Sequence, residues 1–147
     1  MPHEFNTQRR IEFADTDMAG IVHFTRFFVF METAEHEFLR SLGTSVAAKL
    51  NHLQLGWPRL AASCEYLSPA KFEEVLDIRV AVARKGNKSM TYQFEFHRGE
   101  VIIARGQMSS VCCVVGAEGK LKSIPIPDFL AEQIQEAPES KKTNESR

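Results

Sequence analysis

Apolar residues recur at helical spacing over one long stretch of this chain, which begins near Phe27. The apolar stripe contains Met31, Ala34, Phe38 and Leu42. This spacing predicts a helix whose wide apolar face is largely enclosed by the rest of the protein. Gly43 comes next, as expected for a residue just beyond a helix C-terminus.

Elsewhere apolar and polar residues alternate, which predicts strands with one buried face. Strands are predicted over residues 5–13, 57–67, 76–82, 90–96 and 101–115. Short turns separate the later strands, and Lys85-Gly86-Asn87-Lys88 predicts a hairpin. Residues 44–58 fit either a short helix or a connecting loop, whereas residues 126–135 predict a short helix.

The order of these elements predicts an α+β fold. One strand precedes a single apolar helix, and four antiparallel strands follow it. A helix with so many phenylalanines cannot stand alone, so we expect the sheet to wrap around it. The length suits a single domain over residues 1–136. The polar residues 137–147 predict a disordered tail.

Composition and charge argue against several classes of protein. A formal net charge of −1 provides no field that would attract nucleic acid. No run of about 20 apolar residues is present, so no membrane insertion is expected, and the polar start lacks the pattern of a signal peptide. The three cysteines include no C-x-x-C pair, which predicts neither a disulfide framework nor a metal site. The expected location is therefore cytoplasmic.

Two carboxylates, Asp15 and Asp17, lie in the loop before the helix. Aspartates at such a position often cap free N–H groups and favour the helix dipole, and Asp15 fits this structural interpretation. Asp17 also fits a catalytic interpretation, because Ile21 and Val22 would desolvate its carboxylate and suit it to act as a base or nucleophile. Free N–H groups at the helix start could then hold an oxyanion. The spacing alone favours capping.

The stretch Asp15-Thr16-Asp17-Met18-Ala19-Gly20-Ile21-Val22-His23 resembles the signature of the 4-hydroxybenzoyl-CoA thioesterase family, D-x-D-x-x-G-hydrophobic-V-aromatic. Similarity continues in Tyr66-Leu67-Ser68-Pro69, in Glu74-Val75-Leu76 and in Lys88-Ser89, and covers roughly residues 9–130. The resemblance implies a hotdog fold, in which a curved antiparallel sheet surrounds one long helix. It also implies a dimer with active sites at the subunit interface.

The resemblance implies roles for individual residues as well. The catalytic carboxylate falls on Asp17, and the backbone N–H that binds the oxyanion falls on Phe24. Gly20 would let the backbone approach the thioester closely. Lys88 falls on a position that contacts the phosphates of CoA, and Ser89 is a further candidate contact.

The chain departs from the family pattern at several positions. His23 stands where Tyr or Trp is common, so it could orient the substrate or simply form part of the pocket wall. Phe24 replaces a frequent His, Arg26 a frequent Asn, and Glu35 a common Arg. These differences leave the acyl group open. Lys85 is interpreted as a solvated residue of the hairpin.

The implied activity is hydrolysis of an aryl- or short acyl-CoA thioester to a free acid and CoA. Coenzyme A enters as part of the substrate, with no separate cofactor, and the implied assembly is a homodimer or a dimer of dimers. Two other functions stay open. A hotdog hydroxyacyl-thioester dehydratase would use His23 with Glu32 or Glu37. A non-catalytic acyl-CoA or acyl-carrier binding module would need only an apolar pocket.

Overall fold

A computed structural model describes residues 3–138 of the protein. In chain order the elements are β1 (Glu4–Arg10), η1 (Phe13–Asp15), α1 (Arg26–Ser41), β2 (Lys49–Leu50), β3 (Leu53–Gly56), β4 (Arg59–Tyr66), β5 (Val75–Lys85), β6 (Ser89–Arg98), β7 (Val101–Val111), β8 (Cys113–Val115), η2 (Ala117–Gly119), β9 (Leu121–Ser123) and α2 (Asp128–Ala131).

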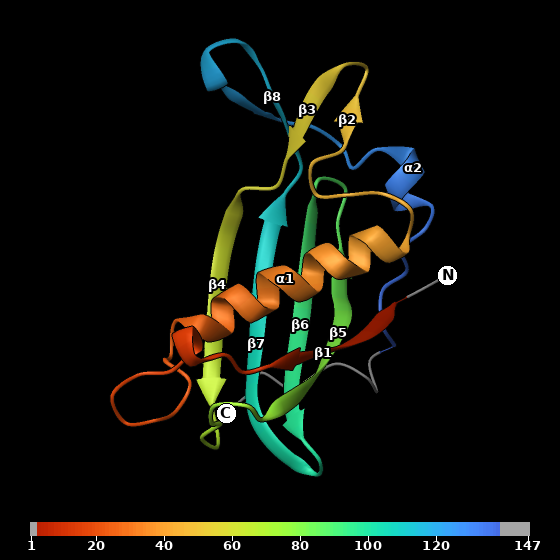
Figure 1. The fold of residues 1–147 in the computed structure, drawn as a ribbon. Coiled ribbons are helices and arrows are strands. Elements are labelled where there is room, and N and C mark those ends of the chain that lie inside the picture. Colours follow the sequence, from red (N-terminus) through yellow and green to blue (C-terminus); the bar gives the residue numbers. More distant parts are fainter. Residues whose placement is uncertain (1–2, 139–147) are drawn as a thin grey trace.

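The main sheet contains five antiparallel strands in the order β1-β5-β6-β7-β4, so β1 and β4 are its edges. Helix α1 lies across one face of this sheet (Figure 1). The strands β2, β3, β8 and β9 form a smaller antiparallel sheet near the turn between β5 and β6. One long helix on an antiparallel sheet confirms the α+β fold predicted from the sequence.

Helix α1 buries a phenylalanine-rich face against the sheet. Its buried residues are Phe27, Phe30, Met31, Ala34, Glu35, Phe38 and Leu39. The ring of Phe27 meets that of Phe96 on β6 edge to face, with 5.3 Å between centroids. Gly106 on β7 permits the close approach of the helix, because a Cβ there would lie 2.3 Å from the Sδ atom of Met31. The outer side of the helix stays exposed, as at Val29, so the helix is less enclosed than predicted.

A buried ion pair ties α1 to the edge strand β4. Arg59, the first residue of β4, donates to both carboxylate oxygens of Glu35, at 2.6 and 2.9 Å. It also donates to the hydroxyl of Ser110 at 2.8 Å. Glu35 is only 2% exposed, and this bidentate partner is what allows a carboxylate to lie under the helix. Burial would lower the pKa of Arg59, but Glu35 and then Glu32 outweigh that effect and raise it.

Two predicted strands have different bounds in the structure. The sequence predicts a first strand that reaches Phe13, but β1 ends at Arg10, and Phe13 lies in η1 with 77% of its surface exposed. The sequence also predicts a continuous strand over residues 101–115. This strand breaks at Cys112, whose N–H still donates to the carbonyl of Lys88 at 2.7 Å but whose carbonyl accepts from the N–H of Ile124, after β9, at 2.9 Å. The chain then changes sheets and continues as β8.

The C-terminal part of the described chain packs beside the end of β5. The ammonium of Lys85 donates to the carbonyls of Ala131 and Ile134, at 2.9 and 2.7 Å. The interpretation of Lys85 as a solvated residue is therefore wrong, because its ammonium binds one carbonyl at the end of α2 and another in the segment that follows it. Ala137 is buried, and its N–H donates to the carbonyl of Val82. Of the predicted tail, residues 139–147 lie outside the described part.

Candidate active site

Asp17 lies in a tight loop closed by an antiparallel bridge between Thr16 and Val22. Its N–H donates to the carbonyl of Ile21 at 2.9 Å, and its carbonyl accepts from the N–H of Gly20 at 3.0 Å. Gly20 has a φ of +79°, which glycine adopts without a steric penalty. A Cβ on Gly20 would have no neighbour within 4 Å in this chain. The positive φ, rather than crowding inside the chain, therefore explains the glycine.

The carboxylate of Asp17 is half-buried and lines a groove in the surface. Its Oδ1 atom accepts a hydrogen bond from the N–H of Ala19 at 2.8 Å, which fixes the side chain across its own turn. Among residues 3–138, no group donates to the Oδ2 atom. One carboxylate oxygen is therefore held in place while the other stays available to a water molecule or a substrate.

Asp15 is completely buried and belongs to an ionic cluster rather than to a cap of α1. The guanidinium of Arg26 lies 2.8 Å from its Oδ1 atom, and that of Arg9 lies at 3.4 Å. The N–H of Glu12 donates to its Oδ2 atom at 2.8 Å. Burial would raise the pKa of Asp15, but the hydrogen bonds from Glu12 and Arg26 and the charge of Arg9 outweigh it and lower the pKa. The predicted capping of the long helix is thus wrong. Asp15 instead neutralises Arg26, a cation in the first turn of α1.

His23 is turned toward the helix start and is not part of the groove lining. Its Nδ1 atom lies 2.7 Å from the hydroxyl of Thr25, and the N–H of Thr25 donates to the same nitrogen at 3.3 Å. Its ring stacks on that of Phe24 with 4.7 Å between centroids. In a single chain His23 therefore supports the backbone around Phe24 instead of facing the groove.

The backbone of Phe24 leads directly into α1. Its side chain is 59% exposed and lines the groove together with Asp17. Within the described part of the chain, the N–H of Phe24 has no hydrogen-bond acceptor. A free donor at the start of a helix adds to the positive end of the helix dipole and suits an anionic group.

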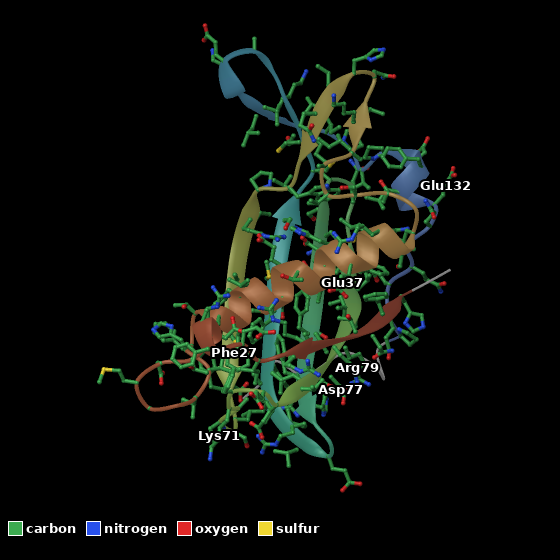
Figure 2. All side chains as sticks on the ribbon, viewed as in Figure 1. Phe27, Glu37, Lys71, Asp77, Arg79 and Glu132 are labelled. Atoms are coloured by element: carbon green, nitrogen blue, oxygen red, sulfur yellow. The ribbon has the colours of Figure 1, made fainter. Side chains whose placement is uncertain are left out.

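The groove has a volume of about 400 Å³. Its lining consists of Asp17, Ile21, Val22, Phe24, Phe27, Tyr66, Leu67, Ser68, Pro69 and Ala70. One wall is the loop and first turn of α1, and the other is the end of β4 with the segment after it. Figure 2 shows Phe27 and Lys71 at this same end of the molecule. Most of the lining is apolar, so a charge developing in the groove would be poorly solvated by water.

Backbone hydrogen bonds hold the second wall in place. The N–H groups of Leu67 and Ser68 both donate to the carbonyl of Ile103, at 2.9 and 3.1 Å. The N–H of Val22 donates to the carbonyl of Ala70 at 2.8 Å, which joins the two walls. No role was predicted for this wall from the sequence. The segment Tyr66-Leu67-Ser68-Pro69, which carries part of the family resemblance, is the pattern that could have indicated its place in the site.

Lys88 lies in the turn between β5 and β6, and Ser89 begins β6. This turn is at the opposite end of the sheet from the last residues of β4 and the start of α1 (Figure 1). Strand β6 runs from Ser89 to Arg98, and its 10 residues span roughly 30 Å. The guanidinium of Arg98 donates to the carbonyl of Pro69, which lines the groove, at 3.0 Å. Lys88 and Asp17 of the same chain are therefore far apart.

Within one chain, the two glutamates considered for a dehydratase contact residues other than His23. Thr7 donates from its hydroxyl to Glu37, and Glu32 lies 3.5 Å from Arg59. Across residues 3–138, no three His, Cys, Asp or Glu side chains gather as a metal site would require. No helix in that part is long and apolar enough to cross a membrane.

Taken together, Asp17, with one free carboxylate oxygen, and Phe24, with a free backbone N–H, line the same apolar groove. The carboxylate can activate water or attack a carbonyl carbon directly. The N–H at the helix start can stabilise the oxyanion that either attack creates. This combination suits hydrolysis of an acyl compound.

The chain matches the thioesterase-like superfamily over residues 11–134. A protein of Aquifex aeolicus that bears the name "Putative esterase" is 31% identical over 121 residues, which cover 82% of this chain and 91% of that protein. The 1,4-dihydroxy-2-naphthoyl-CoA hydrolase of Thermosynechococcus vestitus is 28% identical over 134 residues, covering 90% and 89% of the two chains. The solved structure of a gentisyl-coenzyme A thioesterase has a TM-score of 0.77 and 28% identity, over 86% of this chain and 99% of the other.

These matches extend over nearly the whole described chain, and they agree with the element order and the helix-on-sheet packing. The predicted hotdog fold is therefore confirmed. With the family match covering the loop of Asp17, the start of α1 and the groove, the chain belongs to the thioesterase-like superfamily.

Proposed function

We propose that this protein hydrolyses acyl-CoA thioesters to a free acid and CoA, with Asp17 and the N–H of Phe24 as its reacting groups. The observation that carries the proposal is that Asp17, with a free carboxylate oxygen, and Phe24, with an unbonded N–H, line one groove. Membership of the thioesterase-like superfamily and the CoA thioesterases among its relatives support the same reaction.

In this proposal the thioester carbonyl lies against the start of α1. Asp17 either takes a proton from a water molecule that attacks the carbonyl carbon, or attacks that carbon itself to form an anhydride that water then hydrolyses. In both routes the oxyanion accepts a hydrogen bond from the N–H of Phe24. Gly20 closes the turn that presents the carboxylate, and His23 supports the peptide of Phe24 through Thr25 and ring stacking. CoA is then the leaving group, so no separate cofactor is required.

A complete site in this proposal needs a second subunit. Strand β4 is an edge of the sheet, and it exposes Leu60 and Tyr66. Antiparallel pairing of two β4 strands about a two-fold axis would bury this edge. It would also bring the β5–β6 hairpin of one subunit toward the groove of the other, since the two lie at opposite ends of the sheet. Lys88 and Ser89 would then serve the partner's groove.

We expect the protein to be at least dimeric in solution. Light scattering at micromolar concentration should give twice the 16.7 kDa mass of the chain or a higher multiple. Leu60→Glu, which places a charge on the exposed edge, should shift the protein toward monomer and lower kcat/KM with it. Val101→Glu changes a similarly exposed apolar residue outside β4 and should leave the mass unchanged. A wild-type monomer would refute the composite site.

Lys88→Ala should raise KM for acyl-CoA several-fold and leave kcat nearly unchanged. A phosphate contact far from the thioester contributes equally to the ground state and the transition state. The increase should shrink at high salt, where charge pairing is screened. Steady-state kinetics of the variant at low and high salt would measure both effects.

A substrate truncated to the pantetheine thioester lacks the nucleotide phosphates and should not distinguish Lys88→Ala from wild type. Lys120→Ala, which removes another exposed lysine, is the matched control and should leave KM unchanged. An equal KM increase with the truncated substrate would show that Lys88 does not contact the nucleotide.

A panel of aryl- and alkyl-CoA thioesters tests the proposed substrate class through kcat/KM for each compound. We expect hydrolysis of aryl or short acyl substrates, because the groove is small and carries the rings of Phe24, Phe27 and Tyr66.

We further propose a cytoplasmic location, which the free thiols of the three cysteines support. A protein that dehydrates a hydroxyacyl-CoA without releasing a thiol would fit the dehydratase alternative instead.

A further inference from the structure

Tyr66 forms a direct link between the edge strand and the start of the helix. Its hydroxyl donates to the backbone carbonyl of Phe24 at 2.9 Å. Its ring packs against that of Phe27, with centroids 5.5 Å apart. The two contacts join the last residue of β4 to the residues at which α1 begins. Tyr66 therefore crosses from one wall of the groove to the other.

We propose that Tyr66 is a positioning residue that fixes the Phe24 N–H in the orientation needed to bind an oxyanion. The inference rests on the proposed function, because it concerns the donor of that reaction. Phe24 has no regular backbone hydrogen bonds of its own to hold it, since it precedes the helix and its N–H has no acceptor in the described part. The peptide that carries the Phe24 N–H is held at its other end, where the carbonyl of His23 accepts from the N–H of Arg26 at 2.9 Å. The bond from Tyr66 holds the following peptide through the Phe24 carbonyl, so the two bonds together restrain the torsions of Phe24.

The chemistry of Tyr66 suits a structural donor rather than a proton carrier. Partial burial and the neighbouring Cys64 thiol raise the pKa of Tyr66 above the ordinary value of a phenol. The hydroxyl therefore stays protonated at neutral pH and remains a donor to the Phe24 carbonyl. The hydrogen bond of this hydroxyl to the Phe24 carbonyl gives Tyr66 the role of holding a neighbouring group.

The position of Tyr66 on β4 gives the link a second consequence. Strand β4 is held on one side by β7, with Tyr66 opposite Ala104, and is open on the other. Anything that orders this open edge also orders Tyr66, and through it the peptide of Phe24. The oxyanion donor is thus mechanically coupled to the edge strand.

Tyr66→Phe removes the hydroxyl while keeping the ring that packs on Phe27. We expect kcat to fall about 10-fold with KM within two-fold of wild type, because an oxyanion donor acts in the transition state and not in the bound substrate. The melting temperature should change little, since a single hydrogen bond between neutral groups contributes modestly to stability. Free-thiol release on the best acyl-CoA substrate measures the two constants.

Thr33→Val is the matched control. Thr33 also donates from its hydroxyl to a backbone carbonyl at 2.9 Å, that of Val29, but farther along α1. Removing the Thr33 hydroxyl should leave kcat unchanged. If wild type and Thr33→Val hydrolyse the substrate and Tyr66→Phe has the same kcat, the inference about Tyr66 is refuted while the proposed function stands. A parallel change in KM and melting temperature would likewise refute it, because Tyr66 would then only shape the groove. If wild type hydrolyses no acyl-CoA, the proposed function itself fails.

Discussion

Asp17→Asn is expected to lower kcat by at least ~100-fold without unfolding the protein. The amide oxygen of asparagine can still accept the hydrogen bond from Ala19 that Asp17 accepts at 2.8 Å. The turn closed by Gly20 should therefore persist, and the loss should come from the missing base or nucleophile. The measurement is kcat from thiol release at saturating acyl-CoA, with thermal unfolding as the check on the fold.

Glu100→Gln is a suitable control for this variant. It makes the same carboxylate-to-amide change at an exposed position on the turn between β6 and β7. This control should retain wild-type turnover. A cleanly folded Asp17→Asn protein with near-normal turnover would remove Asp17 from the mechanism.

Asp15→Asn is expected to lower the free energy of unfolding by about 2 kcal/mol at neutral pH. It leaves Arg9 and Arg26 without their shared buried carboxylate, and breaking a buried ion pair is costly. The side chains of Arg9 and Arg26 are 27% and 33% exposed, so water compensates part of the loss. Urea unfolding measures the change. Asp77→Asn, on an exposed residue that accepts from Gln8, should cost much less.

The lowered pKa of Asp15 adds a dependence on pH. A depressed folded-state pKa stabilises the protein above the unfolded pKa, which is about 4 for aspartate. That stabilisation is lost as the pH falls through the folded pKa. Wild type should therefore lose more stability than Asp15→Asn on acidification below about pH 4. Equal losses in the two proteins would contradict the assignment of this charge to the ionic cluster.

The local parts of the fold were predictable from the sequence. The 3.6-residue period of α1 and the two-residue period of β5 and β6 depend on near neighbours in the chain. Gly43, expected beyond the end of the helix, has a φ of +81° in the structure. The break at Cys112 was not predictable, because the carbonyl of Cys112 accepts from the N–H of Ile124, which only the folded chain brings near.

The candidate site also has a part that was predictable from the sequence and a part that was not. Asp17, Gly20 and Phe24 lie within one short loop, so a local sequence motif is enough to group them. Tyr66 reaches Phe24 across 42 positions of the sequence, and no periodicity indicates such a contact. Likewise, no local pattern indicates the ion pair between Glu35 and Arg59. Nor does a local pattern indicate that Lys88 and Asp17 lie far apart in one chain, because their separation depends on the direction of the strands in the sheet.

The most direct test of the proposed function is release of free CoA thiol from an aryl- or short acyl-CoA by the purified wild-type protein. We expect one thiol and one carboxylic acid for each thioester consumed, at a rate far above that of the buffer. The contradicting result is tight binding of the same acyl-CoA in calorimetry with no thiol released. That result would make the protein a binding module and would leave the Asp17 groove without a hydrolytic function.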